Sequence, residues 1–156
     1  MSETPPAGAR SSPATLRNRE PLLAVLERWL PDGACVLEIA SGAGEHAVFF
    51  ARAMPGLTWR PTDPDPDARA SIAAWRETAD LPNLEAPVAL DAADPASWPG
   101  EPVDAVVCIN MIHIAPWAAA EGLMAGAGGR LPSGGQLILY GPYLEAATPT
   151  APSNLA

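Results

Sequence analysis

An apolar run that ends in small residues, VLEIASGAG from Val36 to Gly44, constrains the fold of this chain more than any other segment. The run begins with the β-branched and aliphatic residues typical of an interior parallel strand, whereas residues 41–44 lack the bulk to keep a ligand away from the backbone. Apolar residues then recur at helical spacing over 45–54. A strand, a glycine loop and a helix in this order predict the first half of a βαβ unit that binds a nucleotide.

Two acidic residues accompany this loop. Asp63 follows Gly44 by about 20 residues and ends a second extended run, the place where a βαβ nucleotide fold holds a ribose hydroxyl. Glu38 lies within the first strand, where a buried carboxylate is costly unless loop amides or a ligand's amino group satisfy it. Gly42 and Gly44 alone are equally consistent with a tight turn that needs positive φ. Together with the two acids, they predict a site for an adenosine-containing cofactor.

Strand and helix patterns alternate along the rest of the chain. We expect strands over residues 34–40, 57–62, 86–90, 103–110 and 136–140. We expect helices from Asn18 to residue 30, over 45–54, 65–79 and 116–128, and a short helical turn over 94–99. Five strands that alternate with helices predict an α/β, Rossmann-like parallel sheet with helices on both faces, because parallel strands need right-handed crossovers.

Length and charge narrow the class of protein further. A chain of 156 residues has the length of one domain, and we expect a cofactor-binding domain over 15–156. Residues 1–14 are rich in Pro, Ser, Gly and Ala, so we expect them to form a flexible arm. All nine basic residues are arginines and 18 acids bring the net charge to −9, which argues against nucleic acid as a partner. The sequence carries no signal-peptide or membrane-spanning pattern, and Cys35 and Cys108 lie in apolar strands. We therefore expect a cytoplasmic protein with no membrane partner.

The polar residues where the strands stop are the candidates for chemistry, because ligands of such sheets bind beyond the carboxyl ends of the strands. Besides the glycine loop and Asp63, these are Asp91 and the segment from Asn110 to His113. Asn110 and His113 are the candidate catalytic residues, since either could orient or deprotonate a substrate; a structural histidine bonded to backbone is the alternative for His113. His46, at a helix start, fits capping or cofactor contact better than catalysis. The scattered acids and few His and Cys predict no metal site.

This arrangement resembles the class I S-adenosylmethionine-dependent methyltransferases, whose first motif is an acid-bearing strand that runs into a glycine loop, as from Glu38 to Gly44. The turn LPSGGQL at 131–137 matches the turn before the fifth strand of that family. The likeness extends to a branch that includes methyltransferase-like protein 26. The segments that carry it are RN at 17–18, EIASG at 38–42, TDPD at 62–65, NMIHIAPW at 110–117 and YGPY at 140–143.

The resemblance implies S-adenosyl-L-methionine as the cofactor of the domain over 15–156, and transfer of its methyl group to a small-molecule acceptor. It places Asp63 at the ribose, Asp91 at the adenine amino group and Asn110 near the methyl group. Tyr140, Tyr143 and Trp117 are candidates for a wall of the acceptor site, although aromatics at strand and helix ends are more often core. The cofactor-binding residues that it implies are Asn18, Glu38, Ala40, Ser41, Gly42, Gly44, His46, Asp63, Asp91 and Asn110.

Two features leave alternatives open. Class I methyltransferases usually have seven strands, whereas this chain ends shortly after Tyr143, so we expect the last two strands to be missing and residues 148–154 to form the loop that leads to them. A cofactor-binding but catalytically silent module that acts through partner contacts is therefore the alternative to an enzyme. A nicotinamide-dependent oxidoreductase is a poorer interpretation, because Ala47 stands where the fingerprint has its third glycine. The sequence predicts neither the methyl acceptor nor the oligomeric state.

Overall fold

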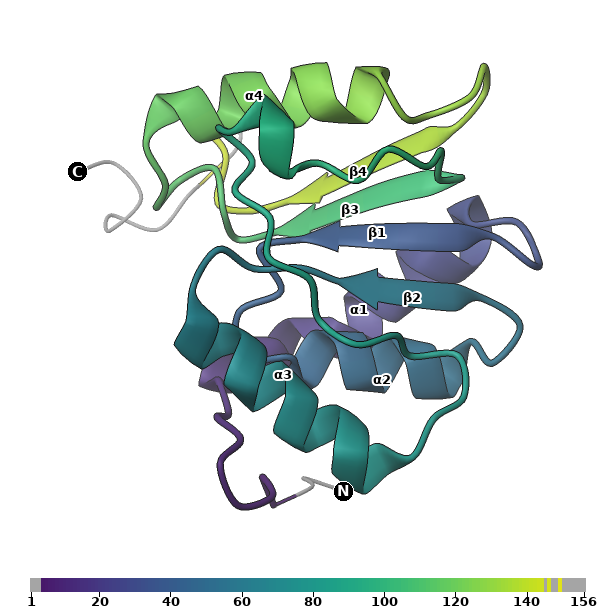
Figure 1. Ribbon diagram of the computed structural model, residues 1–156, viewed down its shortest axis with the longest axis vertical. Coiled ribbons are helices and arrows are strands. Elements are labelled where there is room, and N and C mark those ends of the chain that lie inside the picture. The colour runs from purple at the N-terminus through teal and green to yellow at the C-terminus, as the bar shows by residue number, and fades with distance from the viewer. Residues whose placement is uncertain (1–3, 145, 147–148, 150–156) are drawn as a thin grey trace.

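The computed structural model describes residues 4–144, 146 and 149. The loop expected over 148–154 lies outside these residues, apart from Pro149. The strands are β1 (Cys35–Ile39), β2 (Thr58–Pro61), β3 (Ala105–Ile109) and β4 (Gln136–Tyr140). The helices are α1 (Pro13–Trp29), α2 (Glu45–Ala53), α3 (Pro66–Ala79) and α4 (Trp117–Gly128), with a 3₁₀ turn η1 (Pro95–Ser97). The strands form one parallel sheet in the order β2-β1-β3-β4 (Figure 1), so their carboxyl ends meet at one edge.

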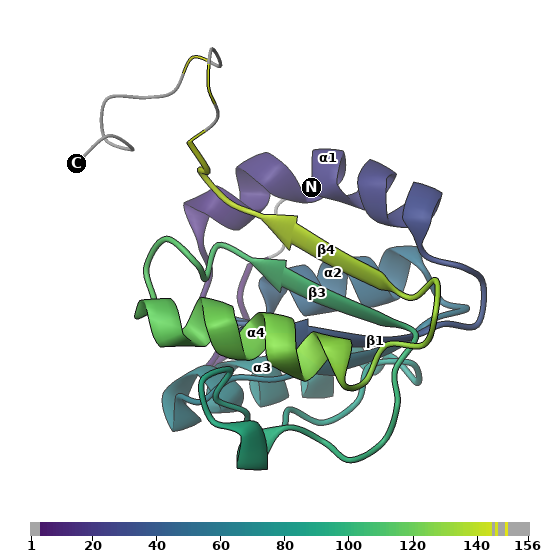
Figure 2. The same cartoon turned by 90° about the horizontal axis from the view of Figure 1, so that it is seen from above.

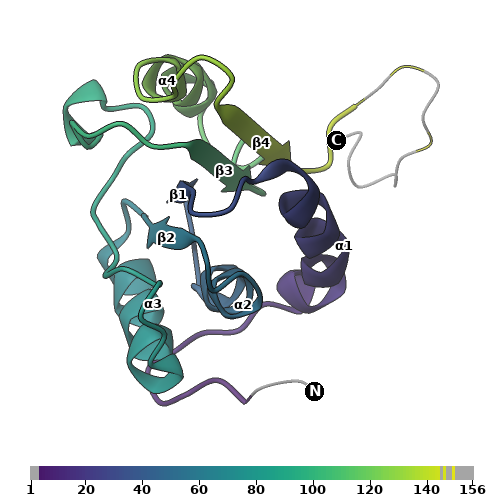
Figure 3. The same cartoon turned by 90° about the vertical axis from the view of Figure 1, so that its right-hand side faces the viewer.

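Helices cover both faces of this sheet (Figure 2, Figure 3). α1 and α2 lie on one face with α3 beside α2, and their apolar side chains share a core with Val36, Trp59 and Val107. α4 and the segment before η1 cover the other face, where Leu37 of β1 packs in the same core as Leu123 of α4. Successive residues of a strand point to opposite faces, so β1 supplies both cores. The predicted α/β class, a parallel sheet between helical layers, is confirmed.

β1 occupies the centre of the sheet and positions the glycine loop. Val36 of β1 lies opposite Trp59 of β2 and Ala105 of β3. β3 is buried along its whole length, as an interior parallel strand requires. Because β1 lies between two neighbours, residues 40–44 emerge at the middle of the carboxyl edge.

The N-terminal segment differs from the sequence expectation. α1 begins at Pro13 rather than at Asn18, inside the segment expected to be a flexible arm. The backbone just before α1 is hydrogen-bonded to α3: the Arg10 N–H donates to Oγ of Ser71 at 2.8 Å, and the indole Nε1–H of Trp75 donates to the Arg10 carbonyl at 2.9 Å. Local composition could not reveal these contacts, because both partners lie far along the chain.

Residues 86–90 do not form the expected strand. A single isolated bridge, between Thr62 and Val88, joins them to the end of β2, and a second bridge joins Trp59 to Leu84 just before them. The Val88 N–H donates to the Pro61 carbonyl at 3.1 Å, but Pro61 and Pro87 each lack the N–H group that a continuous ladder needs. The described residues therefore contain four strands, not the five expected from the sequence.

Two glycines allow α4 to lie close to the residues on either side of η1. A Cβ atom on Gly122 would collide with the carbonyl of Ala92, and one on Gly126 would collide with the ring of Trp98. The Trp98 indole N–H also donates to the Ala92 carbonyl at 3.2 Å. These contacts fix residues 90–93 beside the carboxyl edge of the sheet.

Candidate functional site

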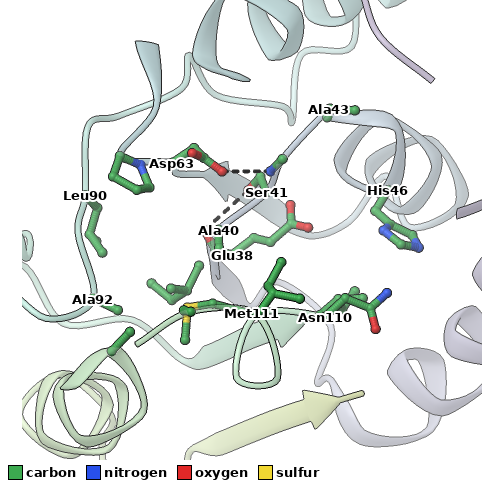
Figure 4. A pocket seen from close by; sticks show the side chains of 18 of the residues that line it. Glu38, Ala40, Ser41, Ala43, His46, Asp63, Leu90, Ala92, Asn110 and Met111 are labelled. Atoms are coloured by element: carbon green, nitrogen blue, oxygen red, sulfur yellow. Dashed lines mark hydrogen bonds between the residues drawn. The ribbon is translucent and has the colours of Figure 1, made fainter. Parts of the chain in front are cut away.

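A cavity of about 640 Å³ opens at the carboxyl edge of the sheet (Figure 4). Its walls come from the loops that follow β1, β2 and β3, from residues 90–93 and from the start of α1. The site residues expected from the sequence that line this cavity are Glu38, Ala40, Ser41, Gly42, Gly44, His46, Asp63, Asp91 and Asn110. Asn18 and His113 instead line a neighbouring hollow, the groove, which also touches Asn110.

The loop after β1 has a backbone conformation that favours glycine. The φ angles of Ala40, Gly42 and Gly44 are 55°, 57° and 88°. A Cβ atom on Gly44 would lie 2.8 Å from the Cα of Ile72 in α3, so only glycine fits there. A Cβ on Gly42 would meet nothing within 4 Å, which leaves its backbone beside open space. The loop thus presents bare backbone to the cavity, next to the unpaired N–H groups at the start of α2.

Asp63, just after β2, holds this loop in place. Its Oδ2 accepts a hydrogen bond from the Gly42 N–H at 2.9 Å, and its Oδ1 accepts one from the Asp65 N–H at 2.9 Å. Asp63 is buried, yet each carboxylate oxygen can accept a further bond. The side chain can therefore fix the loop and accept hydrogen bonds from a ligand's hydroxyl groups at the same time.

Glu38 brings a carboxyl group into the interior of the sheet. The residue is 2% exposed, and its Oε2 accepts a hydrogen bond from the Trp59 indole Nε1–H at 2.8 Å. Burial raises the pKa of Glu38 from 4.5 to about 7, although the bond from Trp59 opposes this shift. The partner expected from the sequence was a loop amide or a ligand amino group; the structure supplies an indole from β2. Glu38 also lines the cavity, so its carboxyl group is in reach of a ligand.

His46 lies in the first turn of α2, and Asn18 supports it. Its Nε2 is 2.7 Å from Oδ1 of Asn18, and its ring stacks on Phe50 with centroids 5.4 Å apart. Burial, followed by the charge of Arg19, lowers the pKa of His46 from 6.5 to about 4. The imidazole is therefore neutral at pH 7, and since the amide oxygen only accepts, Nε2–H donates to Asn18 and Nδ1 is left as an acceptor.

Asn110 borders both the cavity and the groove. It follows β3 with a φ of 59°, and its N–H donates to the Tyr140 carbonyl at 2.8 Å. His113 is exposed on the side of the groove, where a Cβ on Gly141 would lie 3.4 Å from its Nδ1. Of the two candidate catalytic residues, only Asn110 therefore lines both hollows.

The N-terminal segment contributes to the cavity in a way that the sequence did not predict. Ser12, Ala14 and Thr15 line the cavity, and the carboxylate of Glu45 in α2 accepts the Ser12 N–H at 2.9 Å. A serine followed by Pro13 is a typical helix start and could have placed the beginning of α1 here. The contact with Glu45 had no local signal, because it joins segments that are distant in the sequence.

Acidic residues dominate the charge of the cavity. Glu38, Glu45, Asp63 and Asp91 line it, whereas none of its described lining residues is an arginine. Carboxylates accept hydrogen bonds from hydroxyl and amino groups, attract a cation and repel a phosphate. The cavity therefore suits a ligand with a ribose and a positive charge better than one with a pyrophosphate.

The groove has a volume of about 820 Å³ and lies between α1 and the ends of β3 and β4. The residues that it shares with the cavity are Ser12, Ala14, Asn110 and Ile114. Arg17 and His113 line the groove, and within the described part of the chain no Asp or Glu does. Acids thus line the cavity, whereas the adjoining groove has Arg17 and no acid among its described lining residues.

Solved structures of other proteins share this fold. The chain is similar to an O-methyltransferase family protein from Burkholderia thailandensis, with a TM-score of 0.66 and 22% identity over 81% of this chain and 38% of that one. It is similar to a methyltransferase from Thiobacillus denitrificans (TM-score 0.62, 24% identity, 82% of this chain and 48% of that one). A third structure, from Geobacter sulfurreducens, has a TM-score of 0.63 and 22% identity over 89% of this chain and 52% of that one. The last two are S-adenosylmethionine-dependent enzymes in complex with S-adenosyl-L-homocysteine, and the fold is that of the class I methyltransferases.

Within this fold, the chain belongs to the family described as "Protein of unknown function (DUF938)", which matches residues 9–156. The chain spans 38%, 48% and 52% of the lengths of the three structures. The family match includes the residues that form the cavity and the groove.

The described residues also bear on three other kinds of feature: a membrane-spanning helix, a metal-binding group and a reactive cysteine. They contain no helix that is long and apolar enough to cross a membrane. They also contain no group of three or more His, Cys, Asp or Glu side chains that could hold a metal ion. Cys35 and Cys108 are free thiols, and burial raises the pKa of Cys108 to about 12, which makes it an inert core residue.

Proposed function

We propose that this protein is an S-adenosylmethionine-dependent methyltransferase whose cofactor binds in the cavity at the carboxyl edge of the sheet. The observation that carries the proposal is the acidic lining beside an open glycine loop. S-adenosylmethionine has a sulfonium, an ammonium group and ribose hydroxyls but no phosphate, and carboxylates complement all three groups. A nicotinamide dinucleotide has a pyrophosphate, which carboxylates repel, so the same lining argues against an oxidoreductase.

In this proposal each cofactor-binding residue has a role that follows from its position. Asp63 accepts hydrogen bonds from the ribose hydroxyls while it holds the Gly42 N–H. Glu38 accepts a hydrogen bond from the amino group of the methionine part. Asp91 lies at the adenine end, where its Oδ1 also accepts the N–H of Ala93 at 2.9 Å. The backbone of residues 40–44 lies against the cofactor.

The remaining residues align the acceptor and manage its proton. When bound, S-adenosylmethionine supplies an electrophilic methyl group. Asn110, which lines both hollows, orients the acceptor where the hollows meet. His113 takes up the proton that a hydroxyl or amine acceptor loses, and passes it to the solvent to which the imidazole is exposed. Met111 is buried against the cavity and excludes water from this point.

We also infer the branch of the methyltransferases, the size of the acceptor and the cellular compartment. The motifs at 17–18, 62–65, 110–117 and 140–143 favour the branch that includes methyltransferase-like protein 26. The volume of the groove, about 820 Å³, supports a small-molecule acceptor. The free thiols of Cys35 and Cys108 support a reducing, cytoplasmic environment.

Turnover tests this proposal. The protein is incubated with S-adenosylmethionine and fractions of cellular small molecules, and the formation of S-adenosylhomocysteine is measured. We expect product in at least one fraction, and about a hundredfold less of it with His113→Gln, the loss typical of a removed general base. Glu27→Gln, on the exposed surface of α1, is the control and should leave the rate unchanged. Cofactor binding without product in any fraction would favour the catalytically silent module instead.

A further inference from the structure

The groove has an arginine and no acid among its described lining residues, on a protein whose net charge is −9. Arg17, in the second turn of α1, lines it and makes no ion pair or hydrogen bond with the described residues. His113 lines it from the other side, and no Asp or Glu in the described part of the chain lines it to neutralise Arg17. An unpaired guanidinium in a concave surface without acids is suited to bind a carboxylate or another anionic group.

The rest of the groove is mostly apolar and open. Leu22 and Val25 of α1 form one wall, while Tyr140 and Pro142 lie at the end of β4. Val25 is 43% exposed, Tyr140 is 39% exposed and Ile114, at the border with the cavity, is 76% exposed. Apolar surface of this kind, in a hollow of about 820 Å³, is what the hydrocarbon part of a small ligand would cover.

The positive and apolar parts follow one another along a single face of α1. Ala14 lies at the border with the cofactor cavity, Arg17 is one helical turn further on, and Val25 lies two turns beyond Arg17. An acidic group bound at Arg17 would therefore lie near the border with the cavity, and an apolar body would extend away from it. A negative charge at this border is also attracted to a cationic cofactor.

We propose that the groove binds the methyl acceptor, and that the acceptor is an anionic amphiphile: a small carboxylic acid, or a similar anion, with an apolar body and a hydroxyl or amine group that receives the methyl group. Arg17 binds the anionic group, His113 takes up the proton that the hydroxyl or amine group loses, and the wall formed by Leu22 and Val25 contacts the apolar body. This inference rests on the proposed function, because the groove is an acceptor site only if the cavity beside it holds the cofactor.

Calorimetric titration with octanoate tests the inference. The full chain is first saturated with S-adenosylhomocysteine, and octanoate is compared with octanamide, which lacks the charge, and with acetate, which lacks the apolar body. We expect octanoate to bind at least about tenfold more tightly than either, since a charge-assisted hydrogen bond and the apolar contact both contribute. Arg17→Gln should weaken octanoate about tenfold and leave octanamide unchanged. Arg28→Gln is the matched control, because Arg28 is exposed on the same helix, lies over Trp29 and is not part of the groove.

Each outcome bears on one claim. Equal binding of octanoate and octanamide, or equal binding of octanoate to the wild type and to Arg17→Gln, would overturn the anionic class of the ligand. Failure of octanoate to bind a protein that binds S-adenosylhomocysteine normally would overturn the groove as the acceptor site; self-association in sedimentation would then point to a second copy as its occupant. Failure of S-adenosylhomocysteine itself to bind would overturn the proposed function instead. A second variant, Val25→Ser, should weaken octanoate and leave acetate unchanged.

Discussion

The cavity and the groove adjoin, but they differ in the interactions that form them. The cavity is formed by buried acids such as Glu38 and Asp63, fixed by hydrogen bonds, and by backbone at positive φ. The groove is formed largely by exposed side chains, among them Arg17 and His113. A site that always binds the same ligand can be built from residues that also stabilise the fold. A site that selects among ligands can change through surface substitutions that leave the sheet intact. We therefore expect changes in the cavity to affect stability, and changes in the groove to affect recognition alone.

The largest expected effect comes from Gly44→Ala in the loop of the cavity. The alanine would have to adopt the left-handed φ of 88°, and its Cβ would lie 2.8 Å from the Cα of Ile72. Strain and overpacking together should lower the free energy of unfolding by roughly 2–5 kcal/mol, measured by urea denaturation. Gly134→Ala is the matched control, because Gly134 has a φ of 83° but open space around it. An equal loss in both variants would show that the contact with α3 is unimportant.

The next effect is the pH dependence of stability that Glu38 causes. Its pKa is about 7 in the folded protein against 4.5 without burial, so the folded state binds a proton more tightly than the unfolded state. The resulting stability is fully present below pH 4.5 and is lost as the pH rises through about 7, with a slope that approaches about 1.4 kcal/mol per pH unit. Glu38→Gln keeps an acceptor for the Trp59 indole and removes this slope. Denaturation at several pH values from 5 to about 8 measures this slope. If the free energy of unfolding changed with pH in the same way in the variant and the wild type, the assignment to Glu38 would be refuted.

A smaller loss is expected at the wall that both hollows share. Glu45→Ala leaves the Ser12 N–H without its partner, and the hydrogen bond of 2.9 Å is lost. The free energy of unfolding should fall by about 1–2 kcal/mol, and amide exchange should increase at Ser12 and the residues that precede it. Glu27→Ala, on the exposed surface of α1, should change stability by less than about 0.5 kcal/mol. Unchanged exchange in Glu45→Ala would mean that other contacts hold this segment.

The smallest effect on stability is expected in the groove. His113 is exposed, so His113→Gln should change the free energy of unfolding by less than about 0.5 kcal/mol. Thermal denaturation of the variant beside the wild type measures this difference. A loss above about 1 kcal/mol would support the alternative of a structural histidine and would weaken the contrast between the two hollows.

The sequence predicted the parts of the site that depend on local pattern. The strand, loop and helix from Val36 onward, and the position of Asp63 about 20 residues later, follow from spacing alone. The expected strand over 86–90 was wrong, because Pro61 and Pro87 remove donors that the apolar pattern does not report. Prolines within or beside a short run are therefore a stronger signal than its hydrophobicity.

The parts that the sequence did not predict depend on contacts between distant segments. The pairing of Ser12 with Glu45 brings the N-terminal segment to the cavity, and the indole of Trp59 satisfies Glu38 from the next strand. The groove is assembled from α1 and the ends of β3 and β4, so no single stretch of sequence carries its pattern. The positive charge of the groove, carried by Arg17, could be recognised only after the fold brought Arg17 and His113 to the same surface.

The most direct test of the central claim is calorimetric titration of the chain with S-adenosylmethionine, S-adenosylhomocysteine and NADH. The acidic cavity predicts micromolar binding of the first two and none of NADH. It also predicts at least about tenfold weaker binding in Asp63→Asn, which loses acceptor strength toward Gly42 and the ribose. Asp67→Asn, an exposed acid outside the cavity, should bind as the wild type does. Binding of NADH in preference to the other two, or unchanged affinity in Asp63→Asn, would contradict the assignment of the cavity.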